Sequence, residues 1–110
     1  DLTCVEQDEY IQAVNLLKQS GEYAKFVEVH YANRVFTHGR PLFFPWHRWF
    51  LWVFEKELQK VSKSCLTVPY WDSEQDAGDE LNSSVLQADS FGSVQGIKQA
   101  RCGNGICEIG

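Results

Sequence analysis

Three histidines are the residues of this chain whose type and spacing point most directly to chemistry. His30, His38 and His47 are the only histidines among the 110 residues, and they are separated by eight and nine positions. Two helices joined by a short loop can bring three such imidazoles to one point. Neutral imidazoles bind copper, zinc, iron or nickel, and the cluster holds no cysteine or carboxylate. The pattern predicts an all-nitrogen metal site, and the alternative is a set of hydrogen-bonded core histidines.

The elements that must position these histidines are helices. Thr3 followed by Glu6 is typical of a capping box, and the apolar positions after it recur at helical spacing, which predicts a helix over about 4–19. A second helix is expected over about 22–34, and a third over about 45–61. The histidines would then lie on the second helix, in the loop after it and in the first turn of the third.

The third helix should begin at Pro45, because a proline at the first helical position loses no hydrogen bond. His47, Leu51, Phe54 and Leu58 recur at intervals of three and four residues along it, which places them on one face. We expect this face to be buried. The sequence thus predicts a mainly α protein.

Length and composition limit the remaining possibilities. A chain of 110 residues is at most one domain, and residues 73–110, rich in serine, glycine and glutamine, are expected to be mostly loop. The net charge of −5 argues against a nucleic-acid partner, since phosphate contacts need a basic surface. No apolar run approaches the length of roughly 20 residues that a membrane span needs.

Four cysteines, an even number in a short chain, suggest disulfides. An Asn-Gly pair between Cys102 and Cys107 favours a bond that closes a tight turn, and we expect Cys4 to pair with Cys65. Free thiols in a cytosolic protein are the alternative. Together with the glycosylation triplet Asn-Ser-Ser at 82–84, the cysteines favour a secreted protein.

The segment around the last two histidines carries a family resemblance. Residues 38–48 read His-Gly-Arg-Pro-Leu-Phe-Phe-Pro-Trp-His-Arg, with Phe-Glu-Lys-Glu-Leu at 54–58 and Pro-Tyr-Trp-Asp at 69–72. This pattern resembles the first copper-binding motif of the superfamily of tyrosinases, catechol oxidases and hemocyanins. The resemblance covers about residues 3–72 and, more weakly, 84–92.

The resemblance implies that His30, His38 and His47 bind one copper ion. In that family two such ions, each held by three histidines, sit inside a four-helix bundle and react with O2. Tyrosinases hydroxylate monophenols and oxidise diphenols to quinones, whereas hemocyanins carry oxygen. The chain is therefore expected to form half of such a bundle, with phenols and O2 as its small-molecule partners.

The family's second copper motif is missing, and the chain has no further histidine to build it. A second copper half would have to come from a partner chain, from a missing C-terminal part or from a second copy of this chain. The 110-residue chain alone, as a monomer, is not expected to be a competent oxidase. The alternatives are a non-catalytic domain that binds a single metal and an oxygen-binding protein.

Several neighbouring side chains are expected to support the site. Phe43 and Phe44 belong to an aromatic cluster that would keep water from the metal. Arg48 is expected to pair with Asp72 or Glu55 and so to dock the segment after the third helix. We expect no catalytic residue beyond the metal ligands.

Overall fold

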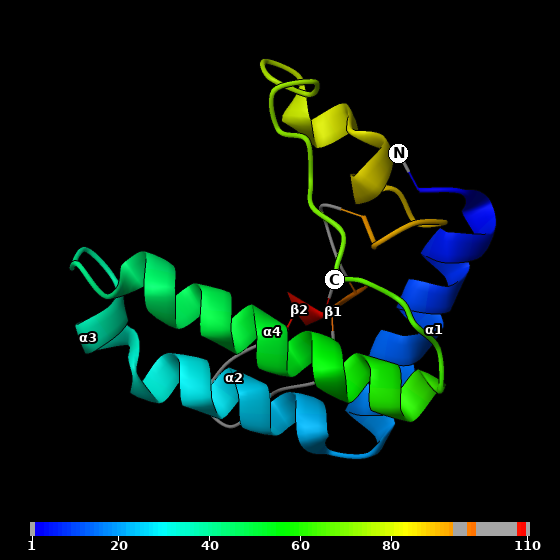
Figure 1. Ribbon diagram of the computed structural model, residues 1–110. Helices are drawn as coiled ribbons and strands as arrows, with labels where there is room; N and C mark the ends of the chain where they lie inside the picture. Colours follow the sequence, from blue (N-terminus) through cyan, green and yellow to red (C-terminus); the bar gives the residue numbers. More distant parts are fainter. Residues whose placement is uncertain (1, 94–96, 99–107, 110) are drawn as a thin grey trace. The chain divides into compact units, whose positions relative to one another are not determined.

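The computed structural model describes residues 2–93, 97–98 and 108–109. It divides into two compact units, Asp1–Pro69 and Tyr70–Gly110. The first unit contains the α-helices, as Figure 1 shows, so the prediction of a mainly α protein is confirmed. No helix among the described residues combines the length and the apolar character needed to cross a membrane. The helices are α1 Cys4–Gln19, α2 Glu22–Ala32, α3 Arg34–Thr37 and α4 Phe43–Ser62.

Helix α1 begins with the predicted capping box. The backbone N–H of Glu6 donates to Thr3 Oγ1 at 3.2 Å, and the backbone N–H of Thr3 donates to Glu6 Oε1 at 3.2 Å. Two N–H groups at the helix start, which have no partner within the helix, are satisfied in this way. These hydrogen bonds favour the ionised carboxylate, so the side-chain and backbone hydrogen bonds with Thr3 lower the pKa of Glu6.

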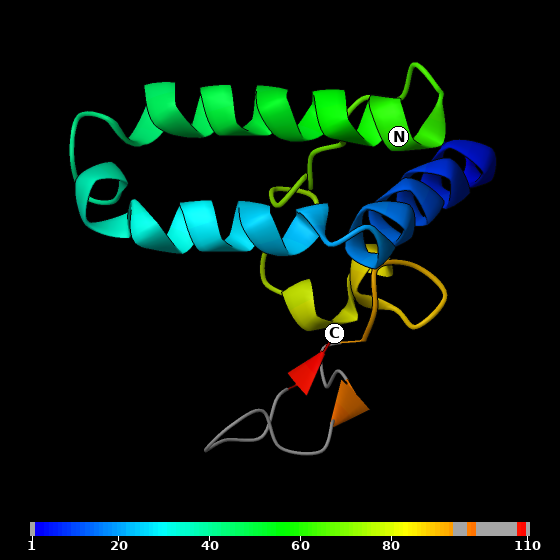
Figure 2. The same cartoon turned by 90° about the horizontal axis from the view of Figure 1, so that it is seen from below.

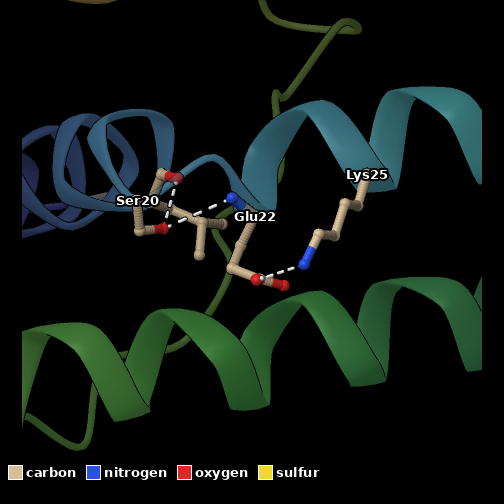
Figure 3. Close-up of polar contacts among 4 residues, drawn as sticks. Ser20, Glu22 and Lys25 are labelled. Atoms are coloured by element: carbon tan, nitrogen blue, oxygen red, sulfur yellow. Dashed lines mark hydrogen bonds and ion pairs between the residues drawn. The ribbon is translucent and has the colours of Figure 1, made fainter.

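A tight junction joins α1 to α2 (Figure 3). Gly21 has a φ of +83°, a left-handed conformation that favours glycine, and it lets the chain turn sharply. Ser20 Oγ donates to the carbonyl of Leu17 at 2.8 Å and accepts the backbone N–H of Glu22 at 3.3 Å. Lys25 Nζ pairs with Glu22 Oε1 at 2.7 Å one turn later. Helix α2 therefore begins at the predicted residue, Glu22.

The second helix ends earlier than predicted. Instead of running to position 34, α2 stops at Ala32, and Asn33 leaves the helical conformation with φ −96° and ψ 3°. Both the side-chain amide and the backbone N–H of Asn33 donate to the carbonyl of Val29, at 2.8 and 3.2 Å, and cap the end of the helix. A separate four-residue helix, α3, follows and ends directly before His38.

Helix α4 starts two residues before the predicted position. It begins at Phe43, so Pro45 is its third residue, where the missing N–H still costs no helical hydrogen bond. The helix ends at Ser62, and Lys63 adopts a left-handed conformation with φ +53°. Figure 2 shows α4 alongside α2 and running antiparallel to it, with α3 in the connection between them. This hairpin carries all three histidines.

The core of the first unit lies where α1 packs against α4, and its fully buried apolar residues are Ala13, Leu17 and Leu58. Phe26 on α2 makes edge-to-face contact with Phe54 on α4, with ring centroids 5.3 Å apart, and joins α2 to this core. Leu58 lies eleven residues, or about 16 Å of helix, beyond His47. The core therefore sits at the end of the hairpin opposite the histidines.

The expected burial of Leu51 is wrong. Its side chain remains 49% exposed, whereas Leu58 on the same predicted face is completely buried. Around α4, Leu51 lies about 100° from Phe50, which packs against Phe26 on α2. Leu51 therefore stands at the edge of the packed face, beyond the reach of α1 and α2.

The expected Cys4–Cys65 disulfide is not formed, since both residues are exposed free thiols. Glu6 and Tyr10 form one wall of a small hollow that residues 64–67 complete. Because each residue of a helix turns by 100°, Cys4 projects about 200° away from Glu6 and so away from this hollow. Cys102 and Cys107, which are expected to form the second disulfide, both lie outside the described residues.

The second unit has short elements, in keeping with the expected loop-rich composition. Its described part contains the single-turn 3-10 helices η1 Glu80–Asn82 and η2 Ser84–Leu86, and the antiparallel pair β1 Ile97–Lys98 and β2 Glu108–Ile109. Asp76 Oδ2 accepts hydrogen bonds from Ser83 Oγ at 2.6 Å and from Trp71 Nε1 at 2.7 Å. One carboxylate thus ties both ends of the segment 71–83 together.

Candidate metal centre

The three histidines meet at the end of the α2–α4 hairpin. His30 comes from α2, His38 follows α3, and His47 lies in the second turn of α4. One ring nitrogen from each residue lies within 4.8 Å of those of the other two. His47 is half-buried, whereas His30 and His38 are exposed. The hairpin therefore forms the predicted cluster, open to the surface on one side.

His47 is oriented by its own helix. Its Nδ1 lies 2.7 Å from the carbonyl oxygen of Phe43, one turn earlier. A carbonyl only accepts, so we assign the proton to Nδ1, which leaves a lone pair on Nε2. The Phe43 ring also packs against the imidazole, with centroids 4.3 Å apart. One residue thus fixes both the tautomer and the plane of this ring.

His38 is held by the end of α3. Its Nδ1 lies 3.1 Å from the carbonyl oxygen of Arg34 and 3.2 Å from Thr37 Oγ1. Thr37 Oγ1 itself donates to the carbonyl of Asn33 at 2.8 Å, so it can only accept from the imidazole. Both neighbours require a proton on Nδ1, and Nε2 of His38 is again the nitrogen with the free lone pair.

His30 is held by aromatic rings. Trp46 stacks on it, with ring centroids 5.9 Å apart and an interplanar angle of 17°. Phe50 lies 5.5 Å from the same imidazole and stacks on Trp46 at 4.9 Å. The Nε2 atom of His30 faces the Nε2 atom of His47 at 3.3 Å. The third imidazole of the cluster is therefore oriented by packing from α4.

The arrangement fits a metal ion of the copper or zinc type. Two nitrogens that each lie about 2.0 Å from one ion are at most about 4 Å apart. The 3.3 Å separation of the His30 and His47 Nε2 atoms meets this limit. For the full set, which spans up to 4.8 Å, side-chain movements of about 1 Å suffice. Three neutral imidazoles without a carboxylate are a donor set that copper accepts.

The other residues expected at the site are only partly brought together. Phe43 contacts both His38 and His47, whereas Phe44 is 80% exposed and touches only the edge of Phe43 among the described rings. These contacts place Phe43, but not Phe44, against the imidazoles.

The expected ion pair of Arg48 is not formed within the first unit. Arg48 is exposed, and the single ion pair among the described residues joins Lys25 to Glu22 rather than Arg48 to Glu55. Glu55 lies seven residues from Arg48, a spacing that these side chains do not bridge along one helix. Asp72 belongs to the second unit, where its Oδ1 accepts the backbone N–H of Gln75 at 3.3 Å.

Sequence reasoning missed two supporting residues, Thr37 and Trp46. Thr37 is only 2% exposed, which is unusual for a polar residue beside a loop. Its position directly before His38 was the available signal, but a hydroxyl at that place has many possible partners. Trp46 lies in the same aromatic stretch of the sequence as Phe43 and Phe44, and only the helix pairing shows that it stacks on His30.

Comparison with known proteins agrees with this geometry. Residues 20–109 match the family described as the common central domain of tyrosinase. The chain is 35% identical to grixazone synthase of Streptomyces griseus over 101 residues, which cover 82% of this chain and 32% of that protein. It is 41% identical to a tyrosinase of Streptomyces antibioticus over 98 residues, covering 82% of this chain and 34% of that protein.

The similarity extends to the tyrosinase of Pelophylax lessonae, at 49% identity over 43 residues, 38% of this chain and 8% of that protein. The chain spans about a third of the length of the Streptomyces relatives that it matches. The family match includes the three histidines and the helices that position them. This chain belongs to the tyrosinase family.

Proposed function

We propose that this chain provides the first copper site of a phenol-oxidising enzyme, with His30, His38 and His47 as the ligands of one copper ion. The observation that carries the proposal is the meeting of the three imidazoles, two of which expose Nε2 lone pairs because their Nδ1 atoms face carbonyl oxygens. The preorganised tautomers mean that no ligand proton must move on those two rings when the ion binds.

The proposed substrates are o-diphenols and O2. Copper, when bound, supplies the change of oxidation state that passes electrons from the phenol to oxygen. Two o-diphenols each lose two electrons and two protons to become o-quinones, and the four electrons and four protons convert one O2 into two molecules of water. Hydroxylation of monophenols belongs to the same proposal as a further step.

The chain's own residues hold and shield the site. Phe43, Trp46 and Phe50 are half-buried and pack on the imidazoles, so one side of the cluster is apolar. This wall excludes water from the ligands and limits their rotation. The opposite side is open, because His30 and His38 are exposed.

The open side supports the proposal that a second copper half completes the site. Val27, three residues before His30, is 55% exposed, and Leu51, four residues after His47, is 49% exposed. At these helical spacings both side chains lie on the histidine-bearing faces. The relatives are about three times as long as the matched region, which is consistent with a further ligand set elsewhere in a complete protein. A segment of the same protein, a separate chain or a second copy could supply it.

The copper-to-chain ratio and the mass of the copper-loaded protein test this proposal. We expect one tightly bound copper per chain, and O2 consumption with a catechol only when a second copper-binding half is present. Sedimentation velocity at micromolar concentration distinguishes a self-associated site from a monomer. A monomer with one copper and no O2 consumption, even after addition of a second half from a relative, would reject the oxidase proposal.

That result would favour the alternative, a domain that binds a single metal without catalysis. The specific observation behind this alternative is the histidine count, since the chain has ligands for one ion only. Oxygen binding without phenol turnover is the third outcome, recognised by reversible O2 uptake in the absence of quinone formation. Export from the cell stays a further proposal, tested by locating the native protein in the culture medium or in the cell.

A further inference from the structure

We propose that Thr37 is a positioning residue of the metal centre, whose hydroxyl holds the His38 imidazole in the tautomer and orientation that direct Nε2 to the metal. This inference deepens the proposed copper site and rests on it. Thr37 is the most deeply buried polar residue of the described chain, at 2% exposure, and it directly precedes the exposed His38. A buried hydroxyl needs hydrogen-bond partners, and both of its partners are known.

The Thr37 hydroxyl donates one hydrogen bond and accepts another. Its hydroxyl gives its single proton to the carbonyl of Asn33 at 2.8 Å, which leaves only lone pairs toward His38 Nδ1 at 3.2 Å. The second neighbour of Nδ1, the carbonyl of Arg34 at 3.1 Å, is also only an acceptor. A proton on Nδ1 satisfies both acceptors, whereas a proton on Nε2 would leave three sets of lone pairs facing one another.

His38 needs this support more than the other two ligands do. His30 and His47 project from α2 and α4, and their backbone positions are set by long helices. His38 lies just beyond the four-residue helix α3 with extended backbone angles, φ −114° and ψ 134°, followed by Gly39 at φ +64°. No regular element continues past it, so its ring is fixed by the local hydrogen bonds to Arg34 and Thr37 and by the ring contact with Phe43.

Hydrogen bonds from the second nitrogen of a ligand imidazole typically change metal affinity by 10–100-fold when removed. Since the Arg34 carbonyl would remain in place after loss of the hydroxyl, we expect the lower end of this range. Thr37→Val keeps the size and β-branched shape of the side chain and removes only the hydroxyl. Thr37→Ser keeps the hydroxyl and removes only a methyl group.

The test compares the affinity of these variants for Cu⁺, measured on the full 110-residue chain by competition with a chromophoric chelator. We expect Thr37→Val to raise the dissociation constant about tenfold and Thr37→Ser to leave it within about threefold of the parent value. Ser62→Ala is the matched control. Ser62 Oγ donates to the carbonyl of Leu58, four residues earlier, as Thr37 does to Asn33, but it contacts no histidine.

Equal affinity of Thr37→Val and the parent would overturn the proposal, and so would an equal loss in Ser62→Ala. If Thr37→Val does not fold, Thr37→Ala takes its place, because it adds no group that the site must accommodate. A parent chain that binds no copper would instead contradict the proposed function, so the two failures are distinguishable.

A second readout needs no metal. In the metal-free parent chain, the ¹⁵N chemical shifts of the His38 imidazole report which nitrogen carries the proton. We expect Nδ1–H in the parent and in Thr37→Ser, and an increased share of Nε2–H in Thr37→Val. Predominant Nε2–H in the parent would overturn the proposal by itself.

Discussion

The Nε2 atoms of His30 and His47 lie 3.3 Å apart although the two residues are seventeen positions apart in the chain. The Nδ1 proton of His47 is donated to the Phe43 carbonyl, so its Nε2 carries a lone pair. Two bare imidazole nitrogens would repel each other at this distance. His30 must therefore present Nε2–H to His47 in this arrangement, and under the proposed function a bound copper ion would take the place of that proton.

Loss of any one of the three imidazoles is expected to abolish stoichiometric copper binding. His47→Ala is the most informative variant, because His47 is the half-buried member and faces both other rings, at centroid distances of 5.3 and 4.9 Å. Copper content after gel filtration, measured by atomic absorption, checks this. Lys25→Ala, at an exposed ion pair, should keep one copper. Retention of copper by His47→Ala would show that the ligands are assigned wrongly.

Trp46→Leu should weaken copper binding by about two- to tenfold, because an aromatic pair contributes about 0.5–1.5 kcal/mol beyond its buried area. Trp46 stacks on His30 and Phe50, and its removal frees the His30 ring to rotate. Trp49→Leu serves as the control on the same helix, since Trp49 is 54% exposed and its ring contacts Trp46 rather than a histidine. Chelator competition measures both variants. Equal effects would assign the role of Trp46 to general packing.

Leu58→Ala and Leu51→Ala, on the same helix, should differ strongly in stability. Leu58 is completely buried, so its truncation should cost about 2–5 kcal/mol. Leu51 is half exposed, and we expect its truncation to cost less than about 1 kcal/mol. Urea unfolding followed by far-UV circular dichroism gives both values. A large loss for Leu51→Ala that appears only in a copper-loaded, self-associated form would show that a partner covers this side chain.

At low pH the segment 71–83 should lose the hydrogen bonds that Asp76 accepts from its two ends. The hydrogen bond from Ser83, and next that from Trp71, lower the pKa of Asp76. A carboxyl group whose pKa is lower in the folded state stabilises that state above its unfolded pKa, and this contribution disappears as the pH falls through the folded value. The indole N–H resonance of Trp71 should therefore move toward its unfolded position below about pH 4.

Two variants make this acid transition specific. Ser83→Ala removes the larger contribution and should move the transition to higher pH, whereas Ser84→Ala, at an exposed neighbour, should leave it in place. A Trp71 resonance that does not change between pH 6 and pH 2 would contradict the role assigned to Asp76.

Much of the fold follows from local sequence signals. Two patterns act within a few residues and determine where helices begin and end: the capping box at Thr3 and Glu6, and the stop at Ser20 and Gly21. Helix α1 therefore has the predicted bounds and α2 the predicted start. The eight- and nine-residue spacing of the three histidines is likewise a local pattern. The clustering of the three histidines was predictable from their spacing, since a short hairpin brings them together.

The tertiary structure decided which atoms of those residues meet. The chain leaves the helical conformation at Asn33, and the short helix α3 that follows provides the end at which His38 and Thr37 are oriented. Leu51 remains half exposed because packing, rather than helical spacing, selects the buried part of an amphipathic face. Cys4 and Cys65 remain free because helix phase directs one thiol away from the other segment. Sequence spacing thus determined which residues approach one another, and the angles and hydrogen bonds of the folded chain determined which imidazole nitrogens face one another.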